Sequence, residues 1–410
     1  MIRLLVLALL LAAPAGAAEP DTGPLPLALV DSVLDDSPLV TEAIARLKAA
    51  EAQARALGLG PHEFTWSGTY IRRSVDREGG YNEFDSTVSR AVRLPGKASL
   101  DRKAGALGID VAQNLLEDAR HQAALQLSEL WHDWLLAAAD ARLAEDAARS
   151  FDSALAAVSR QVKLKDAAPL EADQARAARD NAIATAASAL GLAAAARAAL
   201  AAHFPALPLP DGVPSIAAPA LPGEGLAAWR DLVLSRSHEI RAAELEAERL
   251  AVLAERARRD RFADPSVGVR AFSERSGAET GIGIVASMPL GSGLRRATAD
   301  QASADRSAAE ARLAATRREI AATANMDLAS AAAGMTAWQA AATAADSSRQ
   351  ALARLRGGRR LGAIDLASLL FAERQSFDAD RAELAARAMA VRAIFKLRID
   401  AHLIWAKPEE

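Results

Sequence analysis

The sequence predicts a mainly α-helical protein with a small β part, arranged as two tandem repeats of helix, β-hairpin, long helix and helix. A run from Gly96 to about Lys163 contains no proline and is rich in Ala, Leu, Gln, Glu and Arg, which favour helix. A helix of that length would be roughly 100 Å long. A second such run reaches about Leu355. Before each run a strand-like segment ends at a Pro-Gly corner, and the two corner prolines, Pro95 and Pro289, are 194 residues apart.

Composition limits the classes of function. The 410 residues carry a net charge of −3, so there is no electrostatic case for binding nucleic acid. Only 4% of residues are aromatic, which suits slender, closely packed helices better than a thick globular core. The chain has no cysteine, which excludes thiol catalysis, disulfides and thiolate metal sites.

Residues 1–17 read as a signal peptide. Arg3 gives a positive start, residues 4–13 are apolar, and Ala15-Gly-Ala17 is a small-residue cleavage site. The apolar run is shorter than the roughly 20 residues that a membrane anchor needs. No later stretch has 18 apolar residues without charges, so the sequence predicts an exported protein without a membrane-spanning helix.

The first repeat is expected over residues 37–204. Prolines at 20, 24 and 26 predict that residues 18–36 are extended. Ser37 is the expected N-cap of a helix that begins with Pro38. A hairpin is expected at about residues 62–94, and the long helix to Lys163 follows. After a break, another helix runs to about residue 203.

The same order of elements then repeats after a linker. Residues 205–222 contain six prolines and form the expected linker. The second repeat is expected over residues 223–405, with its hairpin at about 264–289, and residues 406–410 form a C-terminal tail. In each hairpin apolar and polar residues alternate over segments long enough to cross a bilayer at a tilt. An ordinary soluble hairpin gives the same pattern.

Two corners and a helix break carry a resemblance to a known family. The corners are Arg93-Leu-Pro-Gly-Lys97 and Met288-Pro-Leu-Gly-Ser-Gly-Leu-Arg-Arg296, and the break is Arg360-Leu-Gly-Ala-Ile-Asp-Leu. With this layout the chain resembles the TolC-like outer-membrane efflux proteins over about residues 37–405. The short length and the Leu-Pro-Gly-Lys corner look most like the heavy-metal (CzcC-like) branch. The first break departs from the family, because Lys165-Asp-Ala-Ala-Pro169 has no glycine where the second repeat has Gly362.

The resemblance implies a homotrimer in the outer membrane, in contact with its lipid. Four strands from each of three chains would form a 12-stranded β-barrel, continued by a long α-helical tunnel in the periplasm. The family's channels passively conduct substrate to the cell exterior from an inner-membrane pump of the resistance-nodulation-division type and a periplasmic adaptor (membrane fusion protein). The resemblance to the heavy-metal branch implies heavy-metal cations as the substrate here. Four strands alone would leave two open sheet edges, and the unpaired backbone groups of such edges are too costly to place in lipid. Closing a barrel therefore requires strands from further chains. Drug efflux, type I protein secretion and a periplasmic helical scaffold are the alternatives.

No residues predict an enzyme, a cofactor or a metal site. Gly96-Lys97 lacks the preceding glycine of a phosphate-binding loop, since Ala91 stands there. The six histidines show no tight metal-ligand spacing. Trp131 and Trp134 are expected to be helix-packing core.

The candidate sites are the strand-to-helix corners and the two helix breaks. In the family the breaks are the periplasmic tips, where the channel narrows and the adaptor docks. Carried over, the tips are Lys165, Asp166, Ala167, Ala168, Arg359, Arg360, Leu361, Gly362, Ala363, Ile364 and Asp365, and the corners are Pro95, Gly96, Pro289, Gly291 and Gly293. One hypothesis is a gate. Three copies of Asp365, one from each chain, would lie close together at the narrow end of the tunnel, and Arg359 and Arg360 would hold it shut through ion pairs. The other is two ordinary helical turns, with Asp365 capping the final helix.

Overall fold

The computed structural model describes residues 25–406 except 211, 213, 222, 224 and 292. The expected signal peptide and most of the expected tail therefore lie outside the described residues. The predicted mainly helical fold with two repeated units is confirmed. The first unit comprises α1 (Leu27–Asp35), α2 (Pro38–Leu59), β1 (Thr65–Val75), β2 (Gly79–Ala91), α3 (Lys97–Lys163) and α4 (Pro169–His203). The second comprises α5 (Leu226–Arg236), α6 (His238–Arg259), β3 (Ser266–Glu274), the short 3-10 turn η1 (Arg275–Gly277), β4 (Glu279–Ser287), α7 (Gly293–Arg360) and α8 (Leu366–Asp400).

The prediction that residues 18–36 are extended is wrong for helix α1. The prolines that suggested it all precede the helix, and Pro26 is its N-cap residue. Val30, Val33 and Leu34 are fully or almost fully buried, and they recur at helical spacing. Arg120 of α3 also forms ion pairs with Asp31, at 3.1 Å, and with Asp35. Helix α1 is therefore fixed to the core by packing and by charge.

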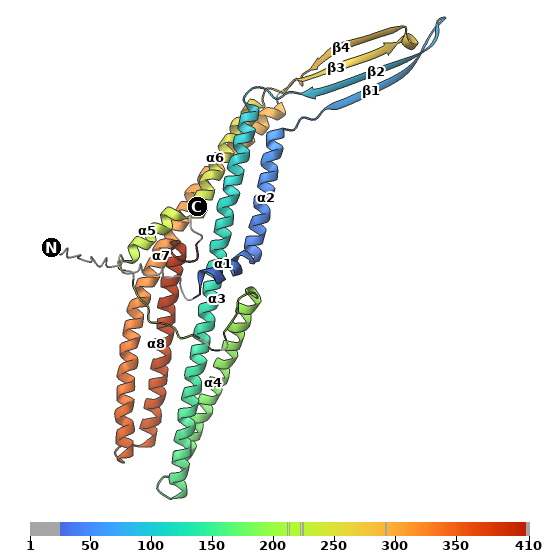
Figure 1. Ribbon diagram of the computed structural model, residues 1–410. Coiled ribbons are helices and arrows are strands. Elements are labelled where there is room, and N and C mark those ends of the chain that lie inside the picture. Colours follow the sequence, from blue (N-terminus) through green and yellow to red (C-terminus); the bar gives the residue numbers. More distant parts are fainter. Residues whose placement is uncertain are drawn as a thin grey trace, which may run out of the picture.

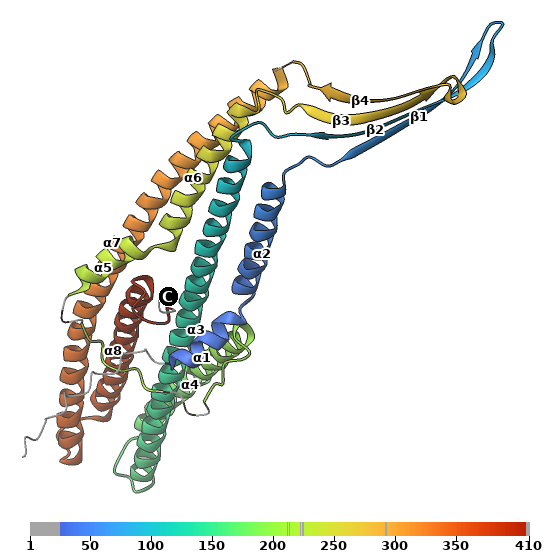
Figure 2. The same cartoon turned by 45° about the horizontal axis from the view of Figure 1, so that its top comes forward.

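Helices α3 and α7 run almost the whole length of the helical part of the molecule, and each has two shorter companions (Figure 1). In the half nearer the sheet α2 packs along α3, and α6 packs between α3 and α7. In the other half α4 packs along α3, and α8 packs along α7. Figure 2 shows the same stacking of α2 above α4 along α3. Each long helix is thus covered along both halves.

The four strands form one antiparallel sheet in the order β1-β2-β3-β4, so the two hairpins join through β2 and β3. In register, Val88 lies opposite both Trp66 and Val269, and Val269 lies opposite Ile284. Directly opposed residues share a face, so one face is apolar: Trp66, Tyr70, Phe84, Val88, Val267, Val269, Ile282 and Ile284. All eight are exposed, and Ile284 has 86% of its surface free.

The opposite face of the sheet is polar. It carries ion pairs between Arg73 and Glu83, at 2.7 Å, and between Arg270 and Asp85. Figure 1 shows the sheet projecting beyond the helices, with no described helix on either face. Within the part of the chain that the structure describes, the apolar face therefore has no covering layer.

The main core lies where α1, α3 and α8 meet. Trp131 and Trp134 are each 2% exposed, with ring centroids 5.2 Å apart, so the prediction that they are core is confirmed. The proline-rich segment is more than a spacer. Its Ile216 is buried, and the Ile216 carbonyl accepts a hydrogen bond from Arg387 at 3.2 Å.

Helix α4 qualifies the expectation about membrane spans. Among the described helices it alone is long and apolar enough, by composition, to cross a membrane. Its hydropathy comes mostly from alanine, which scores as apolar but supplies little apolar area. Ala182, Ala186 and Ala189 are buried. In the structure α4 packs along α3.

Both helix breaks have the same backbone geometry despite different sequences. Gly362 has φ 73° and Lys165 has φ 62°, both in the left-handed region. The amides of Ala363 and Asp166 each donate to the carbonyl five residues earlier, at 2.9 Å in both breaks. This is the Schellman arrangement, which usually has glycine at the left-handed position. Lys165 therefore adopts in the first break the conformation that Gly362 adopts in the second.

Replacing Lys165 with Gly should stabilise the protein. The left-handed conformation costs a lysine about 1–2 kcal/mol, and the greater freedom of glycine in the unfolded chain offsets about 0.4–1 kcal/mol. We expect a net gain of roughly 0.5–1 kcal/mol, measured by urea unfolding. Lys163→Gly, inside the last turn of α3, is the matched control and should lose about 1 kcal/mol. If the Lys165→Gly protein is no more stable than the parent, the left-handed conformation of Lys165 does not strain the native state.

Candidate functional site

The first corner is buried around the side chain of Lys97, which has 1% of its surface exposed. Gly96 turns the chain with φ 83°, and α3 begins at Lys97. The Lys97 ammonium donates to the Phe262 carbonyl at 2.7 Å and to Asp264 Oδ1 at 2.8 Å. It also pairs with Asp260 at 2.8 Å. All three partners belong to the segment between α6 and β3, so one ammonium ties the two units together.

Asp264 accepts two further hydrogen bonds, from the Leu94 amide at 2.9 Å and from His62 Nε2 at 2.8 Å. Burial acts to raise the pKa of Asp264, but the bonds from Lys97, His62 and Leu94 outweigh it and lower the pKa to about 2. The carboxylate therefore stays charged at every physiological pH.

Asp101 is the second buried acid of this corner. It accepts from Arg93 at 3.0 Å and from Arg256 of α6 at 2.7 Å. Arg93 also donates to the carbonyls of Leu57, at 3.0 Å, and Gly58, at 2.8 Å, and so fixes the end of α2. We call this set the corner network: Arg93, Lys97, Asp101, Arg256, Asp260 and Asp264.

The second corner is built differently. Gly291 has φ 94°, so glycine is required there as at Gly96, and Gly293 is the first residue of α7. Arg295 donates to the carbonyls of Gly291 and, at 3.4 Å, Pro289. Leu290 and Leu294 are 88% and 82% exposed. Where the first corner is closed by charges, the second leaves leucines uncovered.

The two helix breaks lie at the same end of the molecule, away from the sheet (Figure 1). Arg359, near the end of α7, pairs with Glu171 in the first turn of α4 at 3.0 Å. It also donates to the Ile364 carbonyl at 3.2 Å. The two helical hairpins are thus joined by an ion pair close to their tips. Leu361, at the second tip, is 86% exposed.

Asp365 caps helix α8. Its carboxylate accepts from the Ser368 amide and from the Ser368 hydroxyl, both at 2.8 Å. These bonds lower the pKa of Asp365. The arginine that joins the tips pairs with Glu171 and not with Asp365. At the first break the N-cap is Ala168, which has no capping side chain, and Pro169 begins α4.

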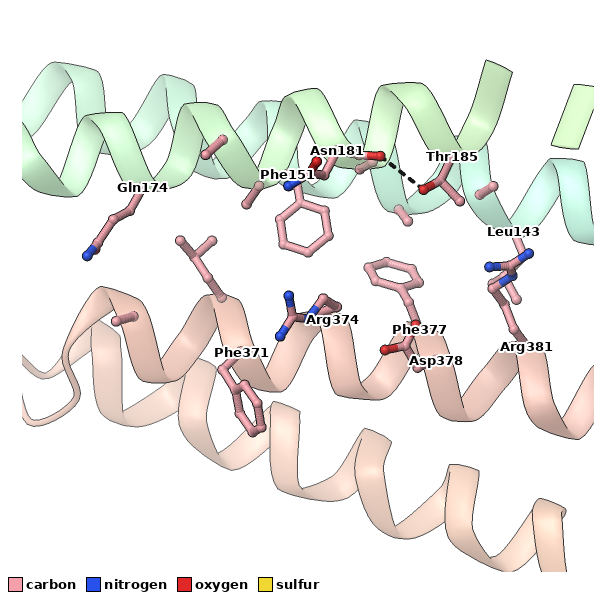
Figure 3. Close-up of a pocket in the computed structure, with 17 residues that line it drawn as sticks. Leu143, Phe151, Gln174, Asn181, Thr185, Phe371, Arg374, Phe377, Asp378 and Arg381 are labelled. Atoms are coloured by element: carbon pink, nitrogen blue, oxygen red, sulfur yellow. Dashed lines mark hydrogen bonds between the residues drawn. The ribbon is translucent and has the colours of Figure 1, made fainter. Parts of the chain in front are cut away.

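A groove of about 460 Å³ lies between the two hairpins above the tips. In Figure 3, Phe151 of α3 and Phe377 of α8 point toward each other across it, while Phe371 points away. The Phe151 and Phe377 ring centroids are 6.1 Å apart. Arg381 at the edge of the groove pairs with Asp140 at 2.6 Å. The groove is lined mainly by apolar side chains, and its charged lining residues, Arg374, Asp378 and Arg381, all come from α8.

Sequence reasoning pointed to both corners and both breaks, but it missed the acids that complete them. Asp264 and Glu171 lie 167 and 188 residues from their partners Lys97 and Arg359. No short-range pattern links residues so far apart. The only sequence feature that could have pointed to Asp264 is Pro265, which follows it and marks the short connection between a helix and the next strand.

Replacing Lys97 with Met should destabilise the protein by about 3–5 kcal/mol, because it leaves Asp264 as a buried charge without its cation. Urea unfolding measures the loss. Lys103→Met is the matched control: its pair with Glu248 is exposed, and its loss should cost at most about 1 kcal/mol. Equal losses of stability in both variants would contradict the corner network.

The corner network also predicts a pH dependence of stability. Since the pKa of Asp264 is lowered from 3.8 to about 2, the stability that its charged form gives the protein is complete above pH 3.8 and is lost as pH falls through 2.

Comparison with known proteins identifies the architecture. No protein-family model matches the chain, and no curated protein matches it in sequence. Solved structures do match. The CmeC outer-membrane channel of Campylobacter jejuni has a TM-score of 0.69 at 15% identity, covering 98% of this chain and 95% of that one. The outer-membrane channel OprN has a TM-score of 0.73 at 19% identity, covering 93% and 90%.

The open state of the Neisseria gonorrhoeae MtrE outer-membrane channel has a TM-score of 0.69 at 19% identity, covering 93% of this chain and 89% of that one. All three matches cover more than nine-tenths of this chain and therefore extend over both units. The likeness is one of fold, at low sequence identity. The chain thus has the fold of the TolC-like outer-membrane channels.

Proposed function

We propose that this chain is the outer-membrane channel of a tripartite efflux system, with its sheet in the outer membrane and its helices in the periplasm. The observation that carries the proposal is the sheet. Its apolar face is uncovered, its strands are 9 to 13 residues long, and the fold is shared with outer-membrane channels. Strands of that length span a bilayer when tilted. A helical scaffold in the periplasm would have no use for an exposed apolar sheet.

Assembly as a homotrimer follows from the free edges. Strands β1 and β4 are the two edges of the sheet, and unpaired backbone groups are not tolerated in lipid. Three chains would pair β4 of one copy with β1 of the next and close a 12-stranded barrel. Leu290 and Leu294, exposed at the second corner, would then be covered by the neighbouring copy.

The helical tips are the proposed meeting point with a periplasmic adaptor and an inner-membrane pump of the resistance-nodulation-division type. Both tips lie at the end far from the sheet, and the groove between the hairpins opens beside them (Figure 3). Conduction would be passive, since the role asks only for a continuous path. Tip residues Lys165–Ala168 and Arg359–Asp365 are the proposed gate and docking segments.

We propose heavy-metal cations as the substrate, on the basis of the short length of the chain and its Leu-Pro-Gly-Lys corner. Drug efflux and type I protein secretion use the same architecture and remain the alternative substrates. Complementation of metal or dye sensitivity in a strain that lacks its own channel, with the channel expressed together with a candidate pump and adaptor, separates these classes.

Oligomeric state and extraction test the channel proposal. Protein in detergent should run as three chains by light scattering, and it should stay in outer membranes during carbonate washing. The reason is that the apolar sheet face is stable only against lipid or detergent. A well-behaved monomer without detergent, or release by carbonate, would favour the helical scaffold instead.

Conductance in planar bilayers tests the tips. Glu171→Gln and Arg359→Ala each break the ion pair between the hairpins, and we expect both to raise the conductance of the resting channel. Asp365→Asn is the matched control. It should change conductance little, because Asn caps a helix almost as well as Asp. If neither variant conducts more than the parent, the pair does not hold the tips closed.

A further inference from the structure

Three histidines that are far apart in the sequence meet near the middle of the molecule. They come from α3 (His121), the start of α6 (His238) and the turn after α8 (His402). The rings of His238 and His402 stack with centroids 4.7 Å apart, and His121 meets His402 edge-on at 5.5 Å. The sequence spacing indicated no tight metal-ligand set among the histidines, and only the packing of distant segments brings these three rings together.

Two acids complete a set of metal-binding donors around His121. One donor atom each from Asp118, His121 and Glu239 lies within 4.8 Å of the others. His121 Nδ1 is 3.8 Å from Glu239 Oε1, and it is buried without a hydrogen-bond partner. A buried ring nitrogen that lies near a carboxylate but makes no hydrogen bond lacks the partner that buried polar atoms ordinarily have.

The other ring nitrogen of His121 is already held. Nε2 lies 2.9 Å from Asp400 Oδ1, and Asp400 is 6% exposed. Lys396 donates to the second Asp400 oxygen at 2.8 Å and keeps that carboxylate in place. Histidines that bind metals usually donate their second N–H to a carboxylate in this way, which directs the free lone pair at the metal. With Nε2–H donating to Asp400, a neutral His121 carries its lone pair on Nδ1, 3.8 Å from Glu239 Oε1.

Electrostatics favours a cation at the same point. Three carboxylates, those of Asp118, Glu239 and Asp400, lie around His121, and Lys396 is paired with Asp400 and Asp327. The surroundings are therefore anionic. An adjoining cavity of about 380 Å³, lined by His121, Glu239 and Asp400, leaves room for the ion and its waters.

We propose that Asp118, His121 and Glu239 bind one divalent transition-metal ion of the Zn²⁺, Co²⁺ or Ni²⁺ type, with Asp400 orienting His121. One imidazole with two carboxylates suits these borderline ions, whereas Mg²⁺ and Ca²⁺ prefer oxygen donors alone. The ion would link α3 of the first unit to α6 of the second. It is a resident, structural ion, so the inference does not depend on the proposed channel function or on its substrate.

Calorimetric titration of Zn²⁺ into the full chain in detergent, after dialysis against EDTA, tests the site. We expect one Zn²⁺ per chain for the parent protein and a visible absorption band with Co²⁺. His121→Ala and Glu239→Gln should abolish saturable binding. Asp400→Asn should keep the stoichiometry but weaken affinity about 10–100-fold, the usual effect of losing the carboxylate behind a ligating histidine.

His203→Ala is the matched control, because His203 contacts Gln126 at 3.2 Å and is not among the donors. It should bind Zn²⁺ like the parent. Circular dichroism without metal checks that each variant is folded. A parent chain that binds no Zn²⁺ at micromolar concentrations overturns the proposal. So does undiminished binding by a folded Glu239→Gln protein, whose change alters charge and leaves side-chain size nearly the same.

Discussion

The buried ammonium of Lys97 is the interaction on which the rest of the structure depends. It lies where a strand turns into a long helix, and its three acceptors all come from the other unit. Because β2 leads into this corner and β3 leaves the acceptor segment, the same contact holds the junction of the two hairpins. It also holds α3 against α6. A buried charge tolerates little displacement, since a lost partner leaves an uncompensated ion. The corner network therefore fixes the sheet relative to the helices.

Along the rest of the long helices, close packing of small side chains holds the helices together, where the corner uses buried charges. The long helices are rich in alanine, so each buries little area per residue and must be packed closely along its length. At Gly105 of α3 an added Cβ would lie 3.0 Å from the Ala54 Cα of α2. At Gly334 of α7 it would lie 3.1 Å from the Ala390 Cα of α8. Such close approach maximises contact between backbones. The cost is that almost any larger side chain at these two positions would push the helices apart.

The repeated order of helix, hairpin, long helix and helix was predictable because proline, glycine and alternating residues act over short distances. Ser37, Pro95, Gly96 and Gly362 each marked a boundary that the structure has. Helix α1 was missed because three prolines before it outweighed a nine-residue helical pattern. The partners of Lys97, Arg359 and His121 were missed for another reason. Charged residues are spread evenly along these helices, and only the packing of distant segments decides which of them meet.

The two tips differ in one respect that affects symmetry. The units repeat at an offset of 197 residues between Lys165 and Gly362, which places Val162 at the position of Arg359 and Ser368 at that of Glu171. In the proposed trimer the six hairpins would meet at six junctions around the axis. The three within chains would carry the Arg359–Glu171 ion pair, and the three between chains would have Val and Ser instead. The ring would be threefold, not sixfold, and breaking the Arg359–Glu171 pair would free the two hairpins of each chain to move separately.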